Sequence, residues 1–152
     1  MQPPILLPHS ATELLSEFVL RKIQRGPNEV LGPGKEHKVL ERYVEGYLVF
    51  TYLWTDNPDV TVSIDLYGDG TVETKVSPRI LYEHGLVLPS ASAPWVSRYD
   101  DEAKVYVALY TPSPWIPWRG FARVKIVNPS VEEARYTFAL WILEREKRRG
   151  WQ

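Results

Sequence analysis

Turn signals recur at short intervals from residue 29 onward and separate segments in which apolar and polar residues alternate. In the segment 60–66, the even positions hold Val, Val, Ile and Leu, and the odd positions hold Thr, Ser and Asp. Successive side chains of a β-strand point to opposite faces, so this period of two predicts strands with one buried face. Turns as frequent as these indicate antiparallel strands. We therefore predict an all-β body over residues 29–144.

The expected body contains roughly seven to nine strands, which favours a two-layer antiparallel β-sandwich, jelly-roll-like in type. The turns are expected at Gly32-Pro33-Gly34, Asp56-Asn57-Pro58-Asp59, Gly68-Asp69-Gly70 and Asn128-Pro129-Ser130. Strands are expected at 38–42, 43–54, 60–66, 71–76, 104–110, 121–127 and 135–143. The last strand should bury Tyr136, Phe138, Leu140 and Ile142 on one face. Residues 77–101 are expected to form the longest loop, with part of it ordered by a contact.

Residues 1–28 are expected to form an extended arm followed by one short amphipathic helix. Ser10 and Glu13 have the spacing of a capping box, and the apolar residues after them recur at helical spacing. Gly26-Pro27 would end the helix, which should span about residues 11–25.

The arm, residues 1–9, contains three prolines that favour an extended backbone. Its Ile5, Leu6 and Leu7 are too apolar for a free tail, so the arm should lie against another surface. That surface is either its own domain or a neighbouring subunit.

A proline-rich segment between two expected strands, Thr111–Arg119, carries Trp115, Ile116 and Trp118. Proline fixes φ and removes a backbone donor, so we expect a stiff connector outside the sheet interior. Such a connector either folds back as a lid on the core or presents a preorganised apolar anchor to a partner. Trp95, in the longest loop, is a further candidate for such a contact.

The composition excludes several classes of function. The 18 Lys and Arg nearly cancel the 19 Asp and Glu, so no global field attracts the chain to nucleic acid or to an anionic membrane. No stretch approaches the roughly 18 apolar residues of a transmembrane helix, and the first residues lack a secretion signal. With no cysteine, the chain has no disulfide, thiolate metal site or thiol nucleophile. A single Met and 13 Pro are typical of a heat-adapted protein, and residues 145–152 should form a solvated charged tail.

No motif indicates an enzyme, a metal site or a cofactor. His9, His37 and His84 occur in separate contexts without the spacing of a zinc site. Asp65 to Gly70 superficially resembles a calcium loop, but the twelfth position is Val76 rather than a glutamate, and a hairpin turn explains the same residues. The residues Asp56, Asp59, Glu73 and Glu83 could supply a carboxylate pair of the glycosidase kind, although the first two are more simply turn formers. We predict no catalytic, cofactor-binding or metal-binding residue.

Six Trp and nine Tyr, many of them in loops or at strand ends, favour a binding surface. The extended arm, short helix, cysteine-free β-body and aromatic loops together resemble the organisation of small virion structural proteins, such as head decoration or minor capsid proteins. This resemblance implies a non-enzymatic protein that oligomerises, often as a trimer, and holds its neighbours through its arm and loops. The β-sandwich size and the tryptophans also resemble a carbohydrate-binding module, which is the alternative.

The sequence therefore predicts a structural or assembly protein whose partners are further copies of itself, with a trimer favoured, and other structural proteins. The predicted contact residues are Ile5, Leu6, Leu7, Trp95, Trp115, Ile116 and Trp118. The expected location is the virion if the resemblance holds and the cytoplasm otherwise.

Overall fold

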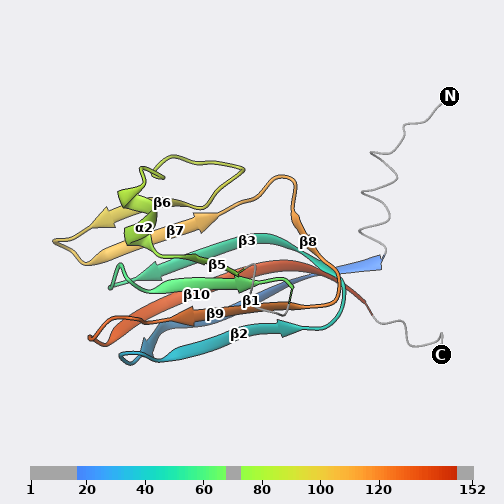
Figure 1. The fold of residues 1–152 in the computed structure, drawn as a ribbon, viewed down its shortest axis with the longest axis horizontal. Coiled ribbons are helices and arrows are strands. Elements are labelled where there is room, and N and C mark those ends of the chain that lie inside the picture. Colours follow the sequence, from blue (N-terminus) through green and yellow to red (C-terminus); the bar gives the residue numbers. More distant parts are fainter. Residues whose placement is uncertain (1–16, 68–72, 147–152) are drawn as a thin grey trace.

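Residues 17–67 and 73–146 are described by the computed structural model of the chain, and they form two antiparallel β-sheets. The predicted all-β fold class is confirmed. The larger sheet has six strands, in the order β1 (Phe18–Leu31), β10 (Ala134–Arg145), β3 (Gly46–Thr55), β7 (Val105–Tyr110) and β6 (Trp95–Asp100), with β8 (Ile116–Trp118) also paired to β3. The smaller sheet has four strands, in the order β2 (Glu36–Arg42), β9 (Ala122–Val127), β4 (Thr61–Asp65) and β5 (Glu73–Val76). Figure 1 shows their arrangement.

The strand pairs are nested from the ends of the described chain inward. The first strand, β1, pairs with the last, β10, while β2 pairs with β9 in the other sheet. Inside these, β3 pairs with β7 and β8, and β4 pairs with β5. The chain crosses from one sheet to the other at both ends of the sandwich. In Figure 1, two of these crossings, the β1–β2 and β9–β10 turns, lie together at the left end.

The core lies between the sheets and follows the alternation seen in the sequence. In β10, the residues Tyr136, Phe138, Leu140 and Ile142 are fully buried, as predicted. From the smaller sheet, Leu40, Val62, Val124 and Ile126 complete the same cluster. Two apolar sheet faces packed against each other hold this sandwich together.

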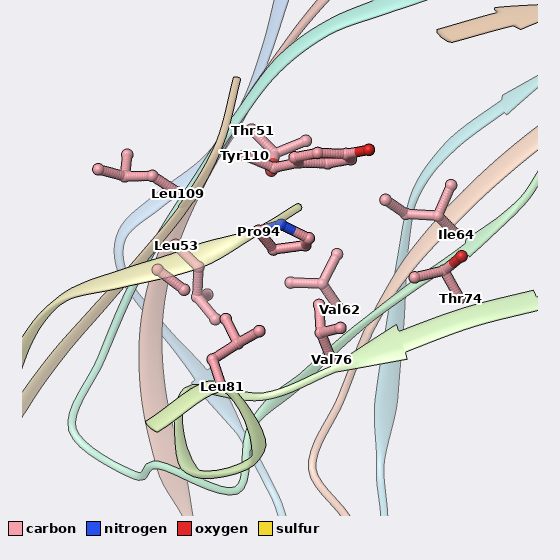
Figure 2. Close-up of a pocket in the computed structure, with 11 residues that line it drawn as sticks. Thr51, Leu53, Val62, Ile64, Thr74, Val76, Leu81, Pro94, Leu109 and Tyr110 are labelled. Carbon is pink, nitrogen blue, oxygen red and sulfur yellow. The ribbon is translucent and has the colours of Figure 1, made fainter. Parts of the chain in front are cut away.

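The interior offers no room for a ligand in the part of the chain that the structure describes. Figure 2 shows a void between the sheets, lined by Leu53, Val62, Val76 and Leu81 among other side chains. Its volume is only about 20 Å³. A void of that size holds about one water and, being apolar, stays dry. Any binding surface formed by the described residues therefore lies on the outside of the sandwich.

The helix predicted for residues 11–25 is wrong over residues 18–25, and residues 11–16 lie outside the described part of the chain. Phe18 to Arg25 belong to β1 and pair residue by residue with β10, from Arg145 to Phe138. The long β10 offers a full ladder of backbone partners, and such tertiary pairing overrides the weak preference for a helix. Gly26-Pro27 does not end a helix but marks the irregularity between Arg25 and Glu29, where the strand register shifts. The capping box and the arm lie outside the described residues.

The loop predicted for residues 77–101 contains two regular elements. Helix α2 (Pro78–Glu83) begins at Ser77, whose side chain accepts a hydrogen bond from the Ile80 amide, with proline in its first turn. It packs beside β6, the edge strand of the larger sheet (Figure 1). Residues 84–94 form the remaining connection, and the Leu86 carbonyl accepts a hydrogen bond from the Val96 amide.

The predicted turns at residues 32–34, 56–59 and 128–130 are confirmed, and the tip of the hairpin between β4 and β5 lies outside the described residues. Asn128 is fully buried and ties two of these turns together. Its side-chain amide donates to the carbonyls of Leu31 and Glu132, at 3.0 and 2.7 Å. The described helix is too short to cross a membrane.

Candidate functional site

The outer face of the larger sheet carries an uninterrupted group of apolar side chains. Because alternate residues of β10 and β3 face the core, the residues between them face outward. The registers align Trp141 with Phe50, and Ala139 with Tyr52 and then Leu109. We call this surface the aromatic face and define it by Phe50, Tyr52, Trp54, Trp95, Val107, Leu109, Ala139 and Trp141.

These side chains are all half-buried, because large neighbours cover one another along the sheet. Figure 2 shows Leu109 directed away from the core residues Val62, Ile64 and Val76, which fits its outward position. Helix α2 leaves this face open, since its Leu81 packs into the core between the sheets. No other described segment forms a layer over the face (Figure 1).

The outer face of the smaller sheet has the opposite character. There Arg123 lies opposite Asp65 and forms an ion pair with it, with 3.3 Å between nitrogen and oxygen. Lys125 pairs with Glu36 at the same separation. The Asp65 carboxylate is buried, whereas Lys125 and Glu36 remain in contact with water. Polar residues are usual on the outer face of an antiparallel sheet, so the aromatic face is the exception in this molecule.

Charged side chains lie at the border of the aromatic face. The Lys22 ammonium lies 5.8 Å from the centre of the Trp141 ring, within the range of a cation–π contact. On the opposite border, Arg98 of β6 pairs with Asp100. An apolar centre with a polar border is the anatomy of a protein–protein interface.

The structure separates the residues predicted for contacts. Ile5, Leu6 and Leu7 lie outside the described residues. Trp95 opens β6, lies opposite Leu109 and belongs to the aromatic face. Its indole nitrogen is buried and has no hydrogen-bond partner in the described structure.

The proline-rich segment is both a lid and an exposed surface. Ile116 to Trp118 form the short edge strand β8 on the beginning of β3, and Trp118 is only 3% exposed. The Trp118 indole N–H donates to the Val44 carbonyl at 2.6 Å, and its ring lies directly against Gly46. Trp115 is 42% exposed and remains available to a partner, whereas Ile116 packs against the core.

Sequence reasoning named only Trp95 of the aromatic face, because it predicted the strands of β3 and β7 without deciding which of their residues face outward. The sequence does contain a signal for this face. The runs Tyr47–Trp54 and Val105–Tyr110 are almost continuously apolar, which is typical of strands covered on both faces.

A cleft lies at the end of the sandwich next to β8. Its volume is about 720 Å³, and it is lined by Tyr47, Tyr67, Phe121, Glu45 and Arg119, among others. Tyr67 is largely exposed. Aromatic rings beside a carboxylate and a guanidinium can stack on and hydrogen-bond to a polar ring.

Several other titratable groups form hydrogen bonds and ion pairs within the fold. The Asp59 carboxylate binds Arg79 at 2.6 Å, and the Asp56 carboxylate accepts from the Arg135 amide at 2.9 Å. Among residues 17–67 and 73–146, no three His, Asp or Glu side chains gather as a metal site would require.

Two buried tyrosines have perturbed acidity. Burial raises the pKa of Tyr136 to about 12, and its hydroxyl shares a 2.7 Å hydrogen bond with Nδ1 of His37. Burial and the Asp101 carboxylate, which accepts a 2.7 Å hydrogen bond, also raise the pKa of Tyr106. His37 lies in β2, and His84 follows α2, where its Nδ1 lies 2.9 Å from the Ile80 carbonyl.

No protein-family model matches this sequence, and no curated protein is significantly similar to it.

Proposed function

We propose that this chain is a non-enzymatic structural or assembly protein that works through protein contacts. The observation that carries the proposal is the aromatic face, whose centre around Tyr52 lacks charge, while the outer face of the other sheet carries ion pairs. Soluble monomers rarely expose a contiguous apolar patch larger than a few hundred Å², and larger patches mark interaction sites. Covering this face with protein removes it from water and provides the driving force for assembly.

The nested strand pairs support a jelly roll as the type of sandwich. In that proposal β1, β10, β3 and β7 form one four-strand layer, and β2, β9, β4 and β5 form the other. Two strands are additions to these layers: β6 pairs with the outer edge of β7, and the short β8 pairs with the beginning of β3. Virus capsid and lectin domains use jelly rolls, so the fold is compatible with a virion component without establishing one.

The proposed partners are further copies of the chain, a trimer included, and other structural proteins. In the proposed assembly, Trp95 and the exposed Trp115 contribute to contacts, and residues 5–7 of the arm reach a neighbour. The solution mass of the full-length chain, measured by light scattering, tests this directly. A species heavier than 17.6 kDa is expected. A strict monomer that captures no structural protein would contradict the proposal.

A truncation isolates the contribution of the arm. Deleting residues 1–9 is expected to weaken the assembly and to leave the fold unchanged, as judged by circular dichroism. An unchanged assembly would remove the arm from the proposal and leave the aromatic face in it.

Carbohydrate binding is the second candidate, and the cleft beside β8 is the observation that favours it. Tyr67 and Phe121 would stack on a sugar ring, and Glu45 and Arg119 would bind its hydroxyls. Retention on a panel of insoluble polysaccharides tests this, with Tyr67→Ala as the variant and Tyr82→Ala, which lies outside the cleft, as the control. Equal retention of the parent and both variants, or no retention at all, would refute the cleft as a sugar site.

A further inference from the structure

We propose that the aromatic face binds the same face of a second copy of this chain, with the two sheets packed face to face about a two-fold axis. This inference rests on the proposed assembly function and names its partner and its surface. Four properties of the face support it: its size, its lack of charge at the centre, its shape and the contrast with the rest of the molecule.

The size of the face suits the centre of a dimer interface. The face lies on four neighbouring strands, β10, β3, β7 and β6, each about 4.8 Å wide, and residues 50–54 of β3 rise about 3.4 Å each, so it measures roughly 19 by 17 Å. That is roughly 300 Å² before the surface relief of the side chains is counted, and the bordering residues supply the rest of the ~800 Å² that each partner of a standard interface buries. The bordering Leu20 is exposed and extends the apolar surface along β1.

The charge distribution favours a contact of the face with itself. In a two-fold interface, residues near the axis meet their own copies, so a charge at the centre would meet a like charge. The centre here is formed by Tyr52, Ala139 and Leu109, which align across three strands and carry no charge. The cations Lys22 and Arg98 lie at opposite borders, far enough out to remain in water.

The rest of the sandwich does not offer a better match among its described surfaces. The outer face of the smaller sheet carries Lys125 and Glu36, whose side chains are in contact with water and would lose it against an apolar surface. A second aromatic face is apolar and sheet-shaped, and two such faces can stack about 10 Å apart with interdigitated side chains.

The arm is the alternative occupant, and its length argues against it. A single extended segment is about 5 Å wide, whereas the face is four strands wide, so residues 1–9 would cover about a quarter of it. Most of the aromatic side chains would stay exposed.

The test introduces a charge at the centre of the face and compares it with the same change elsewhere. Tyr52→Lys places an ammonium where the two copies meet, and Tyr43→Lys makes the identical change on an exposed turn outside the face. Sedimentation equilibrium of full-length proteins over a wide concentration range gives the dimer dissociation constant. We expect Tyr52→Lys to raise it at least about 100-fold, because a buried ammonium without a partner is strongly disfavoured. Tyr43→Lys should leave it within about twofold.

Circular dichroism and thermal unfolding establish that each variant folds. If Tyr52→Lys does not fold, Leu109→Lys replaces it, and Leu88→Lys in the exposed loop before β6 becomes the matched control.

The outcomes separate this inference from the function on which it rests. A parent dimer that Tyr52→Lys dissociates supports both. If the parent forms a trimer or other oligomer whose dissociation constant Tyr52→Lys does not change, the face-to-face dimer is overturned, but the proposed assembly function is not. A full-length monomer that dimerises only after deletion of residues 1–9 shows that the arm covers the face, which also overturns the inference. A monomer under every condition overturns the inference together with the proposal that the chain oligomerises.

Discussion

Replacing Trp118 with alanine should strongly destabilise the protein, because this side chain closes one end of the core. The ring is 3% exposed, its N–H bonds the Val44 carbonyl at 2.6 Å, and it packs on Gly46. Truncating a buried tryptophan typically costs about 3–5 kcal/mol, since the transfer free energy of the ring is lost and a cavity remains. The lost hydrogen bond adds about 1 kcal/mol.

Trp115→Ala is the matched comparison, three residues away on the same segment. Trp115 is 42% exposed, so its truncation should lower the free energy of unfolding by only about 1 kcal/mol. Equilibrium unfolding in urea, followed by far-ultraviolet circular dichroism, measures both changes. With a urea m-value of about 2 kcal/mol/M, Trp118→Ala should lower the midpoint by about 2–3 M and Trp115→Ala by about 0.5 M.

The comparison can refute the lid interpretation. Equal losses for the two variants, or a loss below about 1 kcal/mol for Trp118→Ala, would show that Trp118 does not close the core. The midpoints should be measured at the same protein concentration, because any self-association adds to the apparent stability.

Three further predictions concern the fold. Gly46→Ala should cost about 1–3 kcal/mol or more in thermal unfolding, because the added methyl would meet the Trp118 ring and lie 2.6 Å from the Leu143 carbonyl oxygen; a neutral variant would contradict that packing. Asn128→Ala should cost about 2–4 kcal/mol in urea unfolding, because it leaves buried carbonyl groups without donors, whereas a loss like that of an exposed residue would show that the turns do not depend on it. Tyr136 has a folded-state pKa of about 12 against an unfolded value of about 10, so its contribution is complete below pH 10 and is lost as the pH rises toward 12. The parent should therefore lose up to about 2–3 kcal/mol more than Tyr136→Phe across that window, and parallel pH profiles of the two proteins would refute this.

The sequence predicted the fold class and most strand positions, because period-two alternation and turn residues act locally. Val60, Val62 and Ile64 are buried where the pattern places them, and Asn57 and Asn128 form the expected turns. The error over residues 18–25 has a different origin. The spacing of the apolar residues in this segment also fits a helix. The segment forms a strand because it pairs with β10, which lies more than a hundred residues later in the chain.

The candidate site was harder to predict, because it depends on which strands become neighbours. Tyr52 and Trp141 lie in segments far apart in the sequence, and each is unremarkable as a hydrophobic strand residue. Only the pairing of β3 with β10 and β7 places Tyr52, Ala139 and Leu109 side by side on an open face. Trp115 and Trp118 illustrate the same limit, since their spacing does not reveal which one faces the core.

Protection of a thiol on the aromatic face tests the central claim most directly. The chain contains no cysteine, so Val107→Cys on the aromatic face and Val127→Cys on the outer face of the smaller sheet are matched single labels. Rates of maleimide labelling are measured over a dilution series of the full-length protein. The Val107→Cys thiol should be protected at high protein concentration and should react faster on dilution, while the Val127→Cys thiol should react at one rate throughout. A Val107→Cys rate that does not change with protein concentration would contradict burial of this face between copies of the chain.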